Sequence, residues 1–319
     1  MTTISVIIPV KNGIATIERC LQGLRQQTLG NSIEIIILDS MSTDGSREVA
    51  LKYSARIIDI ATGTFNHGLT RNLGVKYATA NFLFYTVQDA WPATNDLLEN
   101  MVNHFQQDSV MAVVGHQATP HEKDKNPLYW YKPFSTPSIT ERLVVDIPAF
   151  KKLPQQQQEQ LVAWDDVIAM YRKTALIKQP FVATDFAEDW IWSFEALLKG
   201  WKLLHDSSLV MYHYHHRNFE YAYKVTFVIN YHFHLYFNYK PNLQGILLPI
   251  AKATFHVFNN KQLNFKERIY WTLHNYAGML GDYFSRANFL FRLKTGGKNA
   301  LEKGYKKYCS NIPQGKQKL

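Results

Sequence analysis

Apolar segments alternate with amphipathic ones through the first 120 residues of the chain. Residues 4–9 and 35–38 are near-continuous apolar runs, which are typical of strands buried on both faces of a sheet. Shorter runs predict further strands at 57–58, 82–85 and 110–114. Residues between the first two runs recur at helical spacing. Strands that alternate with helices predict right-handed crossovers, and therefore an α/β fold with a mostly parallel sheet flanked by helices.

The pattern changes beyond residue 115. Six prolines and a run of glutamines fall between 116 and 162, and they predict an excursion of short irregular elements. A helix is expected near 187–198. Two separate strands are expected after it, near 202–204 and 209–214.

Beyond Asn218 the sequence is rich in aromatic residues and predicts helices. We therefore expect two domains, an α/β domain at 1–217 and a helical appendage at 218–319. The whole chain of 319 residues is 46% hydrophobic and 19% charged, which excludes wholesale disorder. Its formal net charge of +9 is concentrated near the C-terminus. A basic, aromatic-rich appendage favours contact with an anionic membrane surface or a homodimer interface, and a merely solvated tail is the alternative.

Several classes of protein lose support from the same composition. No uninterrupted apolar run approaches the ~20 residues of a membrane span, and the N-terminus has no secretory signal pattern. Cys20 and Cys309 form neither a zinc pattern nor a disulfide framework. These features predict a cytoplasmic protein, with peripheral attachment to the inner face of the plasma membrane left open.

Polar residues follow the predicted strands at the edge where parallel sheets bind ligands. Asp39 ends the second strand, and the loop and helix start after it read Ser-Met-Ser-Thr-Asp-Gly-Ser. A carboxylate there can accept a hydrogen bond from a nucleotide base or a ribose hydroxyl, although such a stretch alone is also an ordinary loop and helix cap. No Gly-x-Gly-x-x-Gly or Walker loop follows the first strand, so dinucleotide and P-loop enzymes lose support.

The opening of the chain resembles family 2 glycosyltransferases of the GT-A fold. Their pattern of an apolar strand, Pro-x-x-Asn, a helix, and a second strand before Asp-x-Ser-x-Asp-Gly-Ser is matched at 6–12 and 38–46. The resemblance implies that a sugar nucleotide binds here. It implies contacts to the nucleotide from Pro9, Asn12, Asp39, Ser42 and Asp44.

Two further strings resemble the bacterial rhamnosyltransferases within that family. Residues 65–74 read Phe-Asn-His-Gly-Leu-Thr-Arg-Asn-Leu-Gly, and residues 88–90 read Gln-Asp-Ala. An arginine in the first turns of a helix can bind a diphosphate with two hydrogen bonds. The resemblance implies that His67, Arg71 and Gln88 belong to the donor site.

The resemblance also implies a divalent cation, Mn²⁺ or Mg²⁺, held against the sugar diphosphate. Relatives commonly carry Asp-x-Asp where this chain has the single carboxylate of Asp89. On a strand, His213 and His215 face the same side and can reach one metal ion. Rhamnosyltransferase-like relatives carry a His-x-His here, and the resemblance implies that one of the pair completes the Asp89 site or contacts the diphosphate. A structural role for both histidines is the alternative.

An inverting transfer needs a carboxylate that takes the proton of the acceptor hydroxyl. The resemblance places this base at Asp189, in the string Ala-Glu-Asp-Trp-Ile-Trp. Glu188, Trp190 and Asp166 are then candidates for the acceptor side. Two acids at a helix start also stabilise the helix, which is the alternative for Glu188 and Asp189.

The sequence therefore predicts an inverting, metal-assisted glycosyltransferase. Its expected donor is dTDP-L-rhamnose, and its expected acceptor is a surface glycan, often lipid-linked. A GT-A enzyme using a UDP- or GDP-sugar is one alternative. A non-catalytic basic protein that binds anionic lipid or nucleic acid is the other, although no nucleic-acid-binding motif is present and we expect no nucleic-acid partner.

Overall fold

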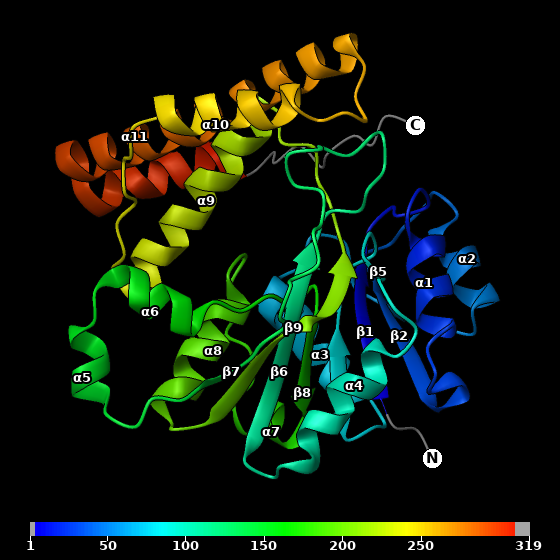
Figure 1. Cartoon of the computed structure of the whole chain (residues 1–319). Helices are drawn as coiled ribbons and strands as arrows, with labels where there is room; N and C mark the ends of the chain where they lie inside the picture. Colours follow the sequence, from blue (N-terminus) through cyan, green and yellow to red (C-terminus); the bar gives the residue numbers. More distant parts are fainter. Residues whose placement is uncertain (1–3, 310–319) are drawn as a thin grey trace. The chain divides into compact units, whose positions relative to one another are not determined.

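The computed structural model describes residues 4–309, which divide into two compact units (Figure 1). The first unit comprises the chain up to Ala118 together with Lys132–His213. The second comprises Thr119–Tyr131 together with the chain from Tyr214 onward. The predicted division into domains at residue 217 stays a prediction, and Thr119–Tyr131 is a part of the second unit that the sequence pattern did not indicate. Lys316 and Lys318 of the basic tail lie outside the described residues.

The strands described in the first unit form one mixed, nine-stranded sheet in the order β3-β2-β1-β4-β8-β6-β9-β5, with β7 also paired to β9. All pairings among β1, β2, β3 and β4 are parallel, and β6 also pairs with β9 in parallel. Strands β5, β7 and β8 run antiparallel to their neighbours. The strand bounds are β1 Ile4–Val10, β2 Ile33–Asp39, β3 Arg56–Asp59, β4 Phe82–Tyr85, β5 Trp91–Pro92, β6 Val110–Ala118, β7 Ile139–Arg142, β8 Ala169–Arg172 and β9 Lys202–Tyr212.

Alternating residues of β1 pack against helices on opposite faces of the sheet. Ile4, Val6 and Ile8 belong to one buried cluster with residues of α1, α2 and α4. Ile7 belongs to the other, with residues of α3, α7 and α8. Because both faces are covered, β1 reads as a continuous apolar run. The helix bounds are α1 Ile17–Arg25, α2 Ser46–Lys52, α3 His67–Tyr77, α4 Leu97–Asn103, α7 Lys173–Lys178 and α8 Glu188–Leu198, with short 3₁₀ turns η1 Gly30–Ser32 and η2 His104–Gln106.

The strand order reverses between β1 and β4, and this reversal sets the place of the site. β2 and β3 lie on one side of β1, and β4 lies on the other. In α/β sheets, ligands bind beyond the carboxyl ends of strands at such a reversal. Asp39 and Asp59 are paired at the ends of β2 and β3, and the Gln88–Asp89 turn follows β4. The predicted donor residues therefore gather at one sheet edge.

The predicted pair of strands near 202–204 and 209–214 is wrong, because a single strand β9 runs through both. The polar stretch between them resembles a turn in sequence. Instead, Asp206 accepts a hydrogen bond from the backbone N–H of Ser208 at 2.9 Å and contacts His104 of the helical turn η2 at 2.8 Å. The pairing of β6 with β9 shifts register at this stretch of β9.

The second unit is helical, as expected. Helices α9 (Phe219–Phe237), α10 (Leu247–Phe258) and α11 (Phe265–Cys309) make up most of it, and α11 turns back at Gly297, whose φ is 53°. Phe227 of α9 is buried against Phe289 and Leu301 from the two arms of α11. The excursion between 132 and 162 contains β7 and two short helices, α5 (Ile147–Lys152) and α6 (Gln155–Val162).

Helix α3 is fastened to the segment that leads into α8. The Asn66 side chain accepts from Leu69 N as a helix cap and from Thr184 N, both at 3.1 Å. Asn72 makes two hydrogen bonds with the backbone of Phe181, at 2.8 and 2.9 Å. A Cβ at Gly68 would lie 1.8 Å from the carbonyl oxygen of Val182. The string at 65–74 is therefore in large part a structural clamp.

Gly68→Ala should destabilise the first unit, because a backbone oxygen blocks the added methyl group. The expected loss in free energy of unfolding is about 1–3 kcal/mol. Gly245→Ala is the matched control, since no atom lies within 4 Å of its would-be Cβ. Denaturant unfolding of both variants measures the difference. Equal stabilities would contradict the clamp.

Candidate functional site

Asp39 is a fully buried carboxylate at the end of β2 with one oxygen left over. Its Oδ2 accepts from the backbone N–H of Ser42 at 3.0 Å and from the Arg47 guanidinium at 2.6 Å. Its Oδ1 has no hydrogen-bond partner among the described residues. A buried, unsatisfied carboxylate oxygen is costly unless a ligand supplies a donor. A ribose hydroxyl or a base N–H supplies one.

The other residues predicted at the nucleotide join two loops to each other. The backbone N–H of Asn12 donates to Ser42 Oγ at 2.9 Å, and Asn12 Oδ1 accepts from Thr43 N at 3.0 Å. Asp44 accepts from Ile14 N at 2.9 Å and from Ser46 N at 3.1 Å. Asn12, Ser42 and Asp44 thus hold the turn after β1 against the loop after β2. Their predicted contacts with a nucleotide stay predictions.

Gln88, which follows β4, contacts the turn after β1. Its Oε1 accepts from the backbone N–H of Lys11 at 2.9 Å. A Cβ at Gly13 would lie 2.6 Å from that oxygen, so the Gln88 amide packs directly against the glycine. Pro9 lies one strand position before Val10 and is paired with Leu38 within the sheet. Gln88 therefore fixes the crevice between β1 and β4.

Two charged residues at this edge were not predicted from the sequence as site residues. Arg47 in the first turn of α2 bridges Asp39 and Asp59, at 2.6 and 2.5 Å. The Lys11 ammonium donates to the backbone oxygens of Ser40 and Met41 at 2.5 and 3.2 Å. A basic residue directly after Gly45–Ser46 at a helix start was the available signal for Arg47.

Asp89 and His213 come together after β4 and β9. Asp89 Oδ1 lies 3.4 Å from His213 Nε2. The Gln117 side chain contacts the other nitrogen of that imidazole. His215, two residues further along the chain, completes a group whose potential ligand atoms all lie within 4.8 Å of one another. β9 ends at Tyr212, so these histidines lie in the segment that follows the strand.

The donor set of one carboxylate and two imidazoles fits a divalent transition metal. Imidazole nitrogen is a good ligand for such ions, whereas Mg²⁺ prefers oxygen ligands. Of the two predicted ions, Mn²⁺ therefore matches these residues better. The Gln117 side-chain amide contacts Nδ1 of the His213 imidazole and holds the ring beside Asp89.

A second group of charges lies around Arg71 of α3. The guanidinium is 6% exposed and forms ion pairs with Asp166 at 2.7 Å and with Glu188 at 2.8 Å. Tyr171 donates its hydroxyl to Asp166, and its own oxygen accepts from Trp164 Nε1 at 2.7 Å. Arg71 would have to release one of these carboxylates to bind a diphosphate. That predicted role stays a prediction, and the ion pairs give Arg71 a positioning role beside it.

Four carboxylates share this one arginine. Asp165, Asp166, Glu188 and Asp189 all lie close enough to influence one another's ionisation. Burial raises the pKa of Asp166 to about 7, with Arg71 opposing the shift and Glu188 adding to it. Burial first, and then the charges of Glu188, Asp166 and Asp165, hold the pKa of Asp189 well above its usual range. The group therefore has proton-accepting capacity near neutral pH.

Asp189 stands at the start of α8 on a strained backbone. Ala187, the residue before Glu188, has a φ of 63°, in the left-handed region that favours glycine. Such strain persists where the surroundings over-determine it, and it gathers at functional sites. Asp189 accepts from Trp190 N at 2.8 Å and from Asp166 N at 3.3 Å, which fixes its carboxylate.

The remaining predicted residues take peripheral places. The His67 imidazole lies 3.8 Å from Glu188 and its side chain is 40% exposed. Trp190 is half-buried at the edge of one core cluster, whereas Trp192 is buried and donates its indole N–H to Gln179. Trp190 alone of the two tryptophans keeps surface for a ligand.

The fold is similar to that of solved structures. The protein called TarS from S. aureus, residues 1–349, superposes with a TM-score of 0.52 at 15% identity, covering 92% of this chain and 74% of that one. Its complex with UDP-GlcNAc also superposes with a TM-score of 0.52 at 15% identity, covering 98% and 82%. The mixed sheet flanked by helices therefore has the GT-A fold.

The chain belongs to glycosyl transferase family 2, whose sequence model matches residues 5–178. The "O-antigen chain rhamnosyltransferase WbaN" of Salmonella anatum is 36% identical over 130 residues, 40% of this chain and 40% of that protein. The "O-antigen chain rhamnosyltransferase RfbN" of Salmonella typhimurium is 38% identical over 128 residues, 39% of this chain and 40% of that protein. The match thus spans about two fifths of the length of these curated relatives.

Removing a ligand from the predicted metal group should weaken Mn²⁺ binding. Asp89→Ala and His213→Ala should each raise the Kd for Mn²⁺ by at least the 10–100-fold that loss of an outer hydrogen-bond partner costs. Asp108→Ala, at a fully exposed carboxylate, is the matched control. Electron paramagnetic resonance of free Mn²⁺ gives the affinities. Unchanged affinity for Mn²⁺ in both variants would show that the ion does not bind at this group.

Proposed function

We propose that this chain transfers L-rhamnose from dTDP-L-rhamnose, with inversion at the anomeric carbon, onto a growing surface glycan. The observation that carries the proposal is the buried Asp39 carboxylate with its unpartnered Oδ1 at the strand reversal. The choice of sugar is supported by the names of the two Salmonella relatives.

The proposed reaction forms one bond and breaks another at the same carbon. The acceptor hydroxyl oxygen attacks the anomeric carbon while the bond to the diphosphate breaks, and the diphosphate leaves with the electron pair. Asp189 takes the hydroxyl proton, and its raised pKa makes it a stronger base than an ordinary aspartate. Arg71 holds Asp166 and Glu188 in place around that base.

Asp89, His213 and His215 would hold a divalent cation, which would supply Lewis-acid stabilisation of the diphosphate charge. The chain's own contribution there is orientation. Gln117 fixes the His213 ring, and Gln88 fixes the turn after β1.

A thermal shift assay with purified protein tests the donor class. With Mn²⁺ present, dTDP-L-rhamnose at 100 times its Kd should stabilise the fold by about 2.7 kcal/mol. Asp39→Asn should abolish most of that stabilisation, since it converts the free carboxylate oxygen into an amide. Stabilisation by a UDP- or GDP-sugar alone would point to a different donor. Stabilisation by oligonucleotides or anionic lipid alone would favour a non-catalytic binding protein.

Asp189→Asn should lower the rate of rhamnosyl transfer by on the order of 10²–10⁴ and leave donor binding intact. Glu195→Gln, on the same helix, is the control and should retain the wild-type rate. Because the base must be ionised and its pKa is raised, the wild-type rate should rise with pH through a value above the ordinary range of aspartate. A near-normal rate in the purified Asp189→Asn protein would reassign the base.

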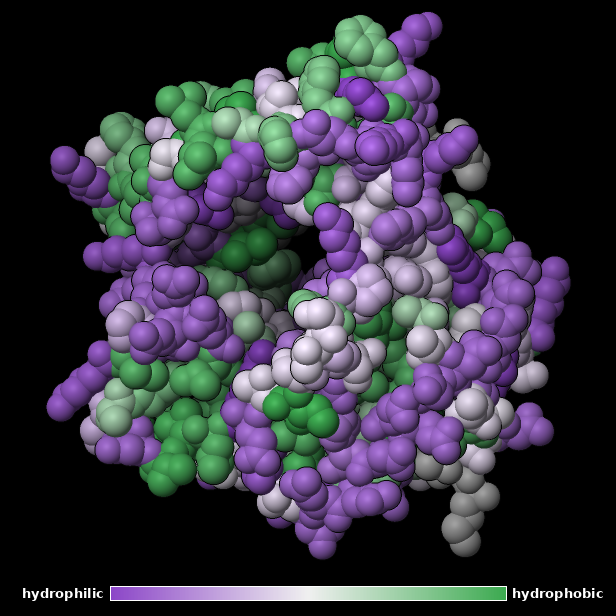
Figure 2. Space-filling view, viewed as in Figure 1, coloured by the Kyte–Doolittle hydropathy of each residue, from purple (hydrophilic) through white to green (hydrophobic). Residues whose placement is uncertain are grey.

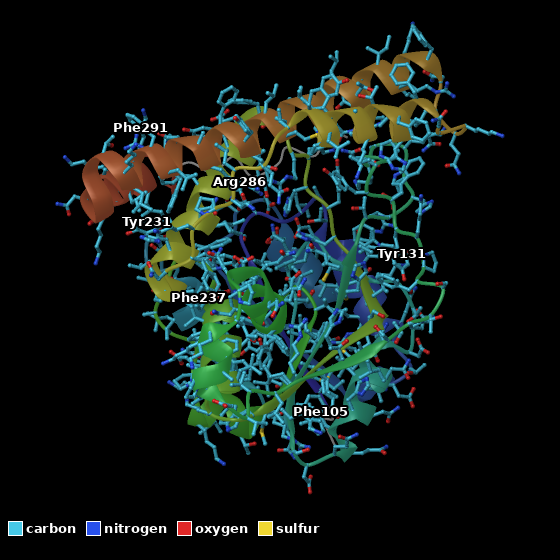
Figure 3. The ribbon with its side chains drawn as sticks, turned by 60° about the vertical axis from the view of Figure 1, so that its left-hand side comes forward. Phe105, Tyr131, Tyr231, Phe237, Arg286 and Phe291 are labelled. Carbon is cyan, nitrogen blue, oxygen red and sulfur yellow. The ribbon has the colours of Figure 1, made fainter. Side chains whose placement is uncertain are left out.

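We also propose that the second unit touches an anionic membrane surface, where a lipid-linked acceptor lies. No helix in the described residues is both long enough and apolar enough to span a bilayer. Leu247, Leu248 and Phe255 of α10 are 64–79% exposed. Figure 2 shows such apolar surface mixed with hydrophilic residues over the helices of this unit. On α11, Phe291 is 66% exposed, and Figure 3 labels it with Arg286 of the same helix.

Leu247→Ser combined with Phe255→Ser should reduce co-sedimentation with anionic vesicles several-fold. The reason is that stable binding of a protein to a bilayer needs apolar and cationic groups jointly. Leu51→Ser is the control, since Leu51 of the first unit is 61% exposed. Binding should rise with the anionic lipid fraction and fall with salt. A salt-insensitive homodimer that ignores vesicles would make these residues a subunit interface instead.

A further inference from the structure

A cavity of about 320 Å³ that is widely open to solvent lies within the second unit, and none of its lining residues takes part in the proposed reaction. Its volume is at the low end of the range of about 300–1,000 Å³ found for small-molecule sites. The residues that line it include Lys123, Asp124, His216, Lys266, Glu267 and Tyr270. They come from three segments that are distant in sequence, so the fold itself assembles this wall.

The polar groups of the cavity include both free donors and free acceptors. Asp124 uses its Oδ2 to hold Lys125 at 2.7 Å, and Glu267 uses its Oε2 to cap α11 through Asn264 N at 2.8 Å. The second oxygen of each carboxylate makes no hydrogen bond in the described part of the chain. Lys123 and Lys266 make no ion pair there either. Two acceptor oxygens and two ammonium groups are therefore left for a ligand.

An aromatic surface lies beside these groups. Tyr270 is 55% exposed, and its ring packs edge-on against Trp271 with centroids 4.9 Å apart. Trp271 is buried and stacks on His216 at 6.1 Å and 5°. An exposed ring held by buried rings presents a fixed apolar face to a ligand.

The charge balance decides the chemical class of that ligand. Two lysines and two carboxylates line the cavity, so a phosphate would meet repulsion from Asp124 and Glu267, and a cation would meet it from Lys123 and Lys266. A neutral ligand with many hydroxyl groups and one apolar face avoids both. We propose that this cavity is a saccharide-binding site, in which sugar hydroxyls pair with these four residues and the C–H face packs on Tyr270.

The walls of the cavity are built to stay in place. The backbone of Tyr131 bonds to Thr119 at 2.8 Å and closes the Thr119–Tyr131 segment into a loop. Within that loop, Asn126 donates to Asn275 of α11 at 2.6 Å. Trp130 packs against the cluster that contains Trp271. A preformed site loses little free energy to ordering when a ligand binds.

The sequence connects this site to the proposed chemistry. His216 of the cavity follows His213 of the Asp89 group by three residues, so their Cα atoms lie at most about 11 Å apart along any chain. We therefore assign the cavity to a sugar of the acceptor glycan. This assignment rests on the proposed function, whereas saccharide binding itself does not.

Saturation-transfer NMR of the full chain tests the site with methyl glycosides of L-rhamnose, D-mannose and D-galactose at millimolar concentration. At least one glycoside should receive saturation, and an excess of dTDP should not displace it. Tyr270→Ala should weaken binding about tenfold or more, because the stacking face is lost. Glu267→Gln, which keeps the helix cap, should also weaken it. Phe291→Ala is the control, an exposed aromatic of the same helix outside the cavity.

The outcomes separate the site from the enzyme. Saturation of none of the three glycosides, or equal saturation in Tyr270→Ala and Glu267→Gln, overturns the saccharide site. Displacement by inorganic phosphate does the same and makes it an anion site. If glycosides bind but no donor is turned over, the proposed function fails and the site stands. If both hold, Tyr270→Ala should raise the KM for acceptor several-fold and leave the KM for donor unchanged, and an unchanged acceptor KM refutes the acceptor assignment.

Discussion

The paired contact of Arg71 with Asp166 and Glu188 is the interaction on which the rest of the site depends. A buried guanidinium between two buried carboxylates is tolerable only while all three are held, and removing one partner of such a pair costs about 3–5 kcal/mol. The three residues come from α3, from the segment before β8 and from the start of α8. Their ion pairs therefore connect elements that the sheet alone would leave independent. The neutral contacts of Asn72 and Gly68 position α3 so that Arg71 can form these ion pairs.

This charge group also raises the proton affinity of a carboxylate at the start of α8. A helix N-terminus alone stabilises the ionised form and lowers basicity. Here burial and three neighbouring carboxylates outweigh that effect, and the pKa of Asp189 lies well above its usual range. With one arginine among four acids, full ionisation would leave the group strongly negative, so a proton is readily held there. The same crowding that is costly for folding raises the pKa values of Asp166 and Asp189, as the proposed base requires.

The sequence predicted the positions of β1 to β4 well and the contacts between distant side chains poorly. Runs such as 4–9 and 35–38 locate strands because both faces are buried, and Asp39 follows from its place at a strand end. The continuity of β9 was missed because Asp206 and Ser208 read as a turn, while a contact from His104, 102 residues away, stabilises the strand. The clamp role of Asn66 and Asn72 was missed for the same reason, since their partners lie more than 100 residues further along the chain. Local patterns carry no information on such distant contacts.

The division of the chain into two units separates the residues that suit the donor from those that suit a saccharide. Residues that suit the donor follow strands of the first unit, where the sheet fixes the backbone and leaves the loops to vary. Those that suit a saccharide belong to helices and to the Thr119–Tyr131 segment of the second unit. The chain passes from one set to the other within the few residues after β9, in which His213, His215 and His216 succeed one another. Under the proposed assignment of the cavity to the acceptor, a change of Lys123 or Tyr270 alters acceptor preference and leaves the buried ion pairs of Arg71 in place.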